Sequence, residues 1–242
     1  MKTVLITGAS RGIGAACAEL FADNGYFTVI NYNRSEERAE ELRRKIEADC
    51  GRCMTVKADV TDRGEVRRMI SLCEYHGGGI DVLINNAGID FYGTFEQTEP
   101  HVWDEVINTN LTGVYNVTYA ALERIKESPC GRIINISSVW GTYGAACEVA
   151  YSASKAAVAG FTRSLAREAG PSGVTVNCIA PGFIETEMNA RFDEAAVKDV
   201  IYRTPLCRTG TAYDVALTAL FLSSEAASFV TGQVIGVDGG FI

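Results

Sequence analysis

The sequence predicts an α/β fold with a doubly wound, mostly parallel sheet of seven strands. Short apolar, β-branched runs alternate with longer helical patterns along the 242 residues, as expected for strands joined by crossover helices. A glycine-rich turn follows the first apolar run and precedes the first helical pattern, which is typical of a strand–turn–helix unit that binds a dinucleotide.

The apolar periodicity sets the order of the elements. The predicted strands are residues 2–7, 27–31, 53–57, 81–84, 132–136, 174–180 and 232–237. The predicted helices are residues 14–23, 35–49, 62–75, 102–128, 150–169 and 212–222, the fourth being interrupted in pattern at 108–110. Residues 187–207 are mixed and partly helical, where a lid over a substrate would lie. No repeat or linker divides the chain, so residues 1–242 are predicted as a single domain.

Composition and charge exclude several classes of protein. A hydrophobic content of 47% allows a large core. The net charge of −8 and the absence of a basic run argue against nucleic acid as a partner. No apolar run approaches a membrane span, and the N-terminal apolar run is too short for a signal peptide. We therefore expect a soluble cytoplasmic protein without a membrane partner.

The eight cysteines are expected to be free thiols. Cys50 and Cys53 form a CxxC pair across a predicted helix-to-strand turn. These two cysteines could have a redox or metal-binding role, or they could be loop cysteines without a function. The second interpretation is favoured because a zinc site would need another pair of cysteines. With only two histidines in the chain, no metal site is predicted.

The glycine-rich turn is predicted to hold the pyrophosphate of a dinucleotide. Gly8 permits the tight turn, Gly12 lets the backbone approach the phosphates, and Gly14 lets the helix pack on the strand. The free N–H groups of the helix N-terminus face the anion. The intervening residues expected to contact the cofactor are Ser10, Arg11 and Ile13.

The end of the second strand predicts NADP in preference to NAD. NAD-binding proteins usually carry an acid there for the ribose 2′-hydroxyl, whereas this chain has Asn31, Tyr32, Asn33 and Arg34. Arg34 and Arg11 would bracket a 2′-phosphate by charge-assisted hydrogen bonds.

The carboxyl ends of the other strands add further candidate cofactor residues. Asp59, followed by Val60, would accept a hydrogen bond from the adenine amino group, or would cap the helix that starts near Asp62. Both roles are open. The remaining candidates are Asn86, Ala87 and Gly88 after the fourth strand and Pro181, Gly182, Ile184 and Thr186 after the sixth.

Four residues form the candidate catalytic group. Ser138 follows an apolar strand, and Tyr151 and Lys155 lie four apart on a predicted helix, so they share a face. A cation beside a phenol in a partly desolvated site favours the phenolate and prepares a proton donor. Asn110 is a polar residue in an apolar stretch; it would satisfy backbone groups or hold a water leading toward Lys155.

These motifs together resemble the short-chain dehydrogenase/reductase family over nearly the whole chain. The matching segments are TGASRGIG at 7–14, Asp59, NNAG at 85–88, Asn110, Ser138, YxxxK at 151–155 and PGFIET at 181–186. Residues 164–188 and the closing VTGQVIGVDGG are most similar to the 3-oxoacyl-[acyl-carrier-protein] reductases of fatty acid biosynthesis. The resemblance implies a Rossmann-type domain, commonly a homotetramer with interfaces on residues 102–128, 150–169 and the last strand.

The resemblance also implies a mechanism for the reduction of a ketone by NADPH. Ser138 would orient the carbonyl, and Tyr151 would give its oxygen a proton. Lys155 would hold the nicotinamide ribose and lower the pKa of Tyr151, and the water on Asn110 would resupply the proton. Ile184 and Thr186 would meet the carboxamide.

One departure concerns the acidic acyl carrier protein as a partner. Reductases of this class tend to carry basic residues near the site mouth, where this chain has Pro129 and Ser172. Arg132, Arg163 and Arg167 would have to compensate. Another small carbonyl or alcohol (a sugar, a steroid or a ketone) is therefore the alternative substrate, and a non-catalytic nucleotide sensor is the remote alternative.

Overall fold

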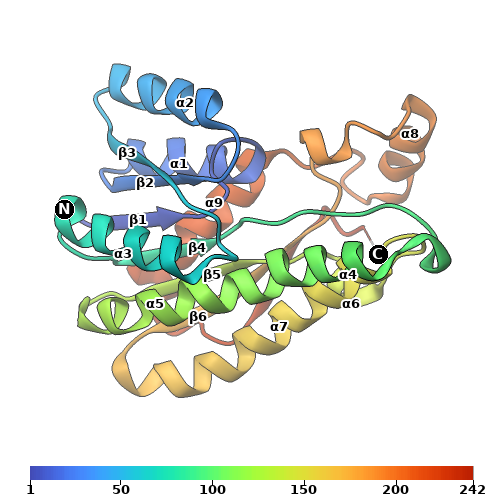
Figure 1. Cartoon of the computed structure of the whole chain (residues 1–242). Helices are drawn as coiled ribbons and strands as arrows, with labels where there is room; N and C mark the ends of the chain where they lie inside the picture. The colour runs from blue at the N-terminus through green and yellow to red at the C-terminus, as the bar shows by residue number, and fades with distance from the viewer. Residues whose placement is uncertain (242) are drawn as a thin grey trace.

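The computed structural model describes residues 1–241 and contains one seven-stranded sheet of order β3-β2-β1-β4-β5-β6-β7 (Figure 1). Every neighbouring pair of strands is parallel. The strands are β1 Thr3–Ile6, β2 Phe27–Tyr32, β3 Arg52–Lys57, β4 Val82–Asn85, β5 Arg132–Ile136, β6 Thr175–Pro181 and β7 Val234–Val237. The predicted doubly wound α/β fold is confirmed, and the sheet is parallel throughout.

Helices cover both faces of the sheet, as Figure 1 shows. They are α1 Gly12–Asp23, α2 Glu36–Ala48, α3 Arg63–Gly77, α4 Pro100–Ile107, α5 Gly113–Glu127, α6 Trp140–Tyr143, α7 Val149–Ala169, α8 Glu194–Arg203 and α9 Ala212–Ser223. Alternate residues of β1 enter opposite cores: Val4 and Ile6 pack with α1 and α9, whereas Leu5 packs with α3 and α5. This period of two explains why both faces of the sheet are apolar.

The predicted helix at 102–128 is divided in the structure. A π-helical turn, Asn108–Thr112, separates α4 from α5. Such a turn holds one extra residue and is frequent at functional sites. Here it contains Asn110, which is completely buried.

The segment after β6 begins with a 3₁₀ turn, Glu187–Asn189, followed by α8. The short helix α6, which was not predicted, starts two residues after Ser138. None of the helices within residues 1–241 combines the length and the apolar character needed to cross a membrane.

The eight cysteines are free, as predicted. Cys50 has a φ of 63° and lies in the turn between α2 and β3, and burial raises the pKa of the Cys53 thiol to about 11. That raised pKa makes Cys53 a poor thiolate nucleophile near neutral pH. Within the described range, no group of three or more potential ligands is arranged to hold a metal ion.

Candidate active site

The strand order reverses between β1 and β4, and ligands of open α/β sheets bind outside the carboxyl ends of the strands at such a point. The glycine-rich turn lies at this edge. Gly8 has a φ of 61°, and a Cβ there would come within 2.8 Å of the Cα of Ala87. A Cβ on Gly14 would lie 2.7 Å from the carbonyl oxygen of Gly8. The turn therefore depends on both glycines to bring α1 against β1 and β4.

The N-terminus of α1 suits an anion. No side chain caps its first turn, and no acidic residue lies there. Its N–H groups are therefore available to a ligand, and the helix dipole favours negative charge. These features fit the pyrophosphate of a dinucleotide, as the sequence predicts.

Hydrogen bonds join the glycine turn to the end of β4. The Thr7 hydroxyl accepts from the backbone N–H groups of Asn86 and Ala87, both at 3.0 Å. The Asn86 amide donates to the carbonyl oxygens of Thr7 (2.9 Å) and Gly8 (3.0 Å). Two segments nearly eighty residues apart thus form one rigid cradle.

Asn31, in β2, connects the glycine turn to the end of β3. Only 1% of the residue is exposed. Its side-chain oxygen Oδ1 accepts from the Gly8 N–H at 3.2 Å, and its side-chain NH2 group donates to the backbone carbonyl oxygen of Ala58 at 3.0 Å. The Asn31 side-chain amide is thus occupied by bonds to the backbone, and its contact with the cofactor stays a prediction from the sequence.

Asp59 does not cap the next helix. Asp62 does so, by accepting from the N–H groups of Gly64 and Glu65, so that alternative was wrong. Asp59 accepts instead from Thr61 and from the Asn33 amide. Burial raises the pKa of Asp59, but these bonds outweigh it and hold the pKa below its ordinary value. Val60, also predicted to contact the cofactor, is buried and accepts from the Asn116 amide at 3.1 Å.

Arg34, Arg11 and Arg38 are the arginines to consider as partners of a 2′-phosphate. Arg34 is exposed, and its charge helps to lower the pKa of Asp59. Arg11 and Arg38 both form ion pairs with Glu187. Arg38 was not predicted, although its position in the first turn of α2, just after Arg34, could have suggested it.

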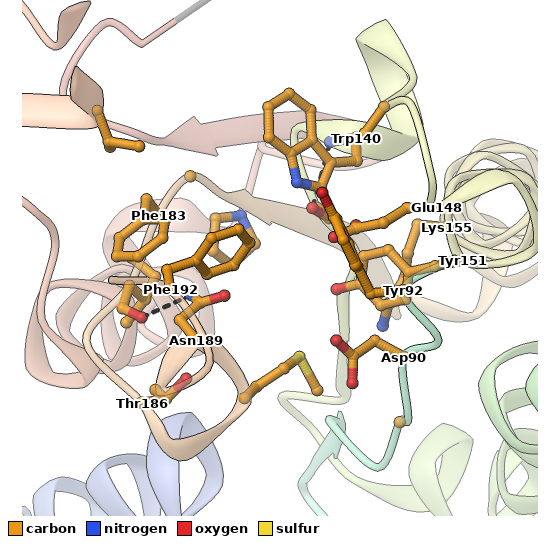
Figure 2. A pocket seen from close by; sticks show the side chains of 18 of the residues that line it. Asp90, Tyr92, Trp140, Glu148, Tyr151, Lys155, Phe183, Thr186, Asn189 and Phe192 are labelled. Carbon is orange, nitrogen blue, oxygen red and sulfur yellow. Dashed lines mark hydrogen bonds between the residues drawn. The ribbon is translucent and has the colours of Figure 1, made fainter. Parts of the chain in front are cut away.

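A cavity of about 510 Å³ opens at the carboxyl ends of β4, β5 and β6. Figure 2 shows Tyr151 and Lys155 on one wall, with Phe183, Phe192 and Thr186 on the opposite wall. The predicted residues that line it are Ile13, Asn86, Gly88, Ser138, Tyr151, Lys155, Pro181, Gly182, Ile184 and Thr186. The predicted residues outside this lining are Gly8, Ser10, Arg11, Gly12, Gly14, Asn31, Arg34, Asp59, Val60, Ala87 and Asn110.

Close packing fixes α7 against β5. The Ser137 hydroxyl donates to the backbone carbonyl of Lys155 at 2.8 Å, and a Cβ on Gly141 would lie 2.7 Å from the carbonyl carbon of Lys155. The segment after β5 that carries Ser138 and the helix that carries Tyr151 are therefore held in one arrangement.

Burial dominates the pKa values of the central pair. It lowers the pKa of Lys155 to about 8, and the ammonium donates to the Ile136 carbonyl oxygen at 2.9 Å. Burial also raises the pKa of Tyr151, and hydrogen bonding with Ser138 offsets only part of that effect. The pKa of Tyr151 therefore lies above its ordinary value in this structure, because desolvation penalises the phenolate more than nearby groups stabilise it. That Lys155 lowers this pKa stays a prediction.

Asn110 adopts the first of its two predicted roles. Its carbonyl oxygen accepts from the Ile89 N–H at 2.8 Å, and its amide donates to the Ile89 carbonyl oxygen (2.8 Å) and the Ser154 hydroxyl (3.0 Å). It joins the loop after β4 to α7 beside Tyr151 and Lys155. The water-holding role stays a prediction, which the second lone pair of the Asn110 carbonyl oxygen would permit.

Comparison with known proteins gives full-length matches. The family model described as enoyl-(acyl carrier protein) reductase matches residues 8–242. The chain is 42% identical over 241 residues to the 3-oxoacyl-[acyl-carrier-protein] reductase FabG of Thermotoga maritima, covering 100% of this chain and 98% of that one. The reductase of the same name from Staphylococcus aureus is 41% identical over 239 residues, covering 99% and 97%. The chain belongs to the short-chain dehydrogenase/reductase family. It is an oxidoreductase acting on the CH–OH/C=O pair.

This short-chain dehydrogenase/reductase carries a charged cluster in its cavity that the sequence analysis missed. Arg191 pairs with Asp90 and, at 2.9 Å, with Glu148, and its guanidinium lies 5.0 Å from the ring centroids of both Tyr92 and Phe192. Burial raises the pKa of Glu148, and the charge of Arg191 opposes that rise. Glu148 immediately precedes α7, three residues before Tyr151, and this position beside the helix start could have identified it.

Proposed function

We propose that the chain is an NADPH-dependent reductase that converts the ketone of a 3-oxoacyl thioester, carried on acyl carrier protein, into a secondary alcohol. The observation that carries the proposal is the placement of Ser138, Tyr151 and Lys155 in one cavity beside a pyrophosphate cradle. The names of the full-length relatives support the thioester as substrate.

Ser138 and Tyr151 are the groups proposed to act on the carbonyl oxygen. Bound NADPH supplies the hydride. The Ser138 hydroxyl, 7% exposed, orients the carbonyl by a hydrogen bond. The raised pKa of Tyr151 keeps it a phenol, which gives its proton to the oxygen as negative charge develops there.

Lys155 is proposed to resupply that proton and to hold the cofactor ribose. A pKa of about 8 lets this ammonium exchange protons near neutral pH. Its neighbour Gly88 leaves room at this place: a Cβ there would lie 3.4 Å from the Lys155 ammonium and 3.2 Å from the Asn110 carbonyl oxygen.

NADP is the cofactor that the cations favour. The tip of β2 offers Arg34 in place of an acid, and Arg11 and Arg38 converge from the glycine turn and α2 on a carboxylate. Guanidinium pairs of this kind suit a phosphate monoester.

A second substrate class is supported by the charged cluster and by the surface. Arg191, Asp90 and Glu148 give the cavity a polar wall that suits a small hydroxylated carbonyl compound better than a long acyl chain. Of the arginines expected to compensate for missing basic residues, Arg132 is buried and unsuited to docking, whereas Arg163 and Arg167 are exposed.

The deciding experiment is an assay of NADPH consumption. Acetoacetyl thioesters, on acyl carrier protein and on a small thiol, are compared with ketones and sugars. We expect the thioesters to have the highest kcat/KM; no thioester activity together with rapid reduction of another carbonyl would reject the proposal. The cytoplasmic location and the homotetramer stay predictions from the sequence.

A further inference from the structure

Glu187 is held by two arginines from separate elements. Its carboxylate lies 3.5 Å from the guanidinium of Arg11, in the glycine turn, and forms a hydrogen-bonded ion pair with Arg38 of α2. The hydrogen bond from Arg38 is the main cause that lowers the pKa of Glu187. A single carboxylate therefore marks a place where two guanidinium groups converge on an anion.

The segment that carries Glu187 lies directly over the glycine turn. A Cβ on Gly12 would be 3.4 Å from the Cγ2 of Thr186. The Asn189 amide donates to the Ile184 carbonyl oxygen at 2.8 Å, so residues 184–189 form a compact turn. Glu187 extends from this turn toward α2, while Ile184 and Thr186 line the cavity.

We propose that Glu187 is a specificity-determining residue that competes with the 2′-phosphate of NADP for Arg11 and Arg38. The inference rests on the proposed cofactor. A phosphate monoester carries more charge than a carboxylate and three acceptor oxygens, so it is the stronger partner for two guanidinium groups. When the phosphate binds, Glu187 loses its partners and the turn at 184–189 loses its ionic attachment to the glycine turn and to α2.

A cofactor without the 2′-phosphate offers no such exchange. NADH leaves the Glu187 ion pairs intact, and its adenosine ribose gains nothing from Arg38. Glu187 thus reduces the affinity for NADPH without altering that for NADH, while Arg38 raises the affinity for NADPH alone.

Adenosine fragments test this competition independently of catalysis. We would titrate the full-length protein with 2′,5′-ADP and with 5′-AMP by calorimetry at low salt, for wild type, Glu187→Gln and Arg38→Gln. Loss of two exposed ion pairs predicts that Glu187→Gln binds 2′,5′-ADP about 5-fold more tightly, with 5′-AMP unchanged. Arg38→Gln should weaken 2′,5′-ADP alone.

Glu194→Gln is the matched control. Glu194 is an exposed carboxylate in α8 that pairs with Lys198 at 2.7 Å, and its loss should change neither affinity. The gain in Glu187→Gln should also shrink at high salt, because exposed charges are screened.

Two results separate the possible failures. If wild type prefers 2′,5′-ADP and Glu187→Gln leaves that affinity unchanged, or tightens 5′-AMP equally, the competition is overturned and the choice of NADP stands. If neither wild type nor Glu187→Gln binds 2′,5′-ADP more tightly than 5′-AMP, the proposed cofactor is rejected together with the inference.

Discussion

The ammonium of Lys155 lies 5.6 Å from the centroid of the Tyr151 ring and donates its hydrogen bond to the Ile136 carbonyl oxygen. The two side chains share a helix face, but the ammonium is bonded to the end of β5. In this arrangement both groups are governed by burial, which lowers the pKa of the amine and raises that of the phenol. Each shift favours the neutral form.

The buried ammonium predicts a pH-dependent cost in stability. The pKa of Lys155 is about 8 in the folded protein and 10.5 for the free group. Below pH 8 the folded protein holds an unfavourable buried charge, and this cost disappears as the pH rises from 8 toward 10.5 because the unfolded chain then binds more protons. It amounts to about 3 kcal/mol.

Lys155→Met should therefore be more stable than wild type, and the gain in the free energy of unfolding should be largest below pH 8. The difference between the two free energies of unfolding should shrink as the pH is raised, when urea denaturation is followed between pH 7 and 9.5. The comparison cancels the contribution of thiols remote from Lys155, and burial keeps the nearby Cys178 thiol at a pKa of about 11, above the range measured. A difference independent of pH would show that the ammonium is not desolvated.

Glu148→Gln should raise the kcat of reduction below pH 8. Burial is the main cause of the raised pKa of Tyr151, and the charges of Glu148 and Asp90 raise it further, against Arg191. Removing the Glu148 charge lowers the pKa of Tyr151 and makes the phenol a stronger acid. The kcat measured below pH 8, where Lys155 keeps its proton, should therefore rise; an unchanged or lower kcat, or a rise matched by the exposed Glu123→Gln, would argue against this coupling.

Gly8→Ala should destroy the cradle. The φ of 61° strains any L side chain, and the new Cβ would lie 2.8 Å from the Ala87 backbone. We expect a loss of more than about 2 kcal/mol of stability and no detectable binding of 2′,5′-ADP. Gly170→Ala is the control, since its Cβ would meet nothing within 4 Å. If Gly8→Ala bound 2′,5′-ADP as tightly as wild type does, the glycine-rich turn would not be part of the cofactor site.

Asn110→Ala should destabilise the loop after β4. It leaves both backbone groups of the half-buried Ile89 without their partner, and we expect a total cost of about 1–3 kcal/mol, since a fully buried unsatisfied group costs that much alone. Thermal unfolding should show a lower Tm, and hydrogen exchange should rise at Ile89. Unchanged exchange there would contradict the account.

The order of the elements and the chemistry at the strand ends could be predicted from the sequence because they depend on local patterns. A short apolar run identified β1, and the glycines of the turn have roles that only glycine can fill. The bonds of Asn31 to Gly8 and Ala58 could not be predicted, because both partners are distant in the sequence.

Long-range ion pairs could not be predicted for a similar reason. Arg191 meets Asp90 from 101 positions away, and no periodicity connects them. The pKa of Tyr151 could not be predicted from the sequence either. The degree of burial decides whether desolvation, which raises this pKa, outweighs hydrogen bonds and nearby cations, which lower it.

The kcat of Tyr151→Phe with an acetoacetyl thioester and NADPH tests the account most directly. The phenyl ring keeps the packing of α7 and removes the proton donor. We predict that kcat falls at least ~10²-fold, while the affinity for NADPH, measured by fluorescence titration, stays within about twofold because the cradle is untouched. Near-normal turnover in this variant would contradict the assignment of Tyr151 as the acid, and with it the proposed reaction mechanism.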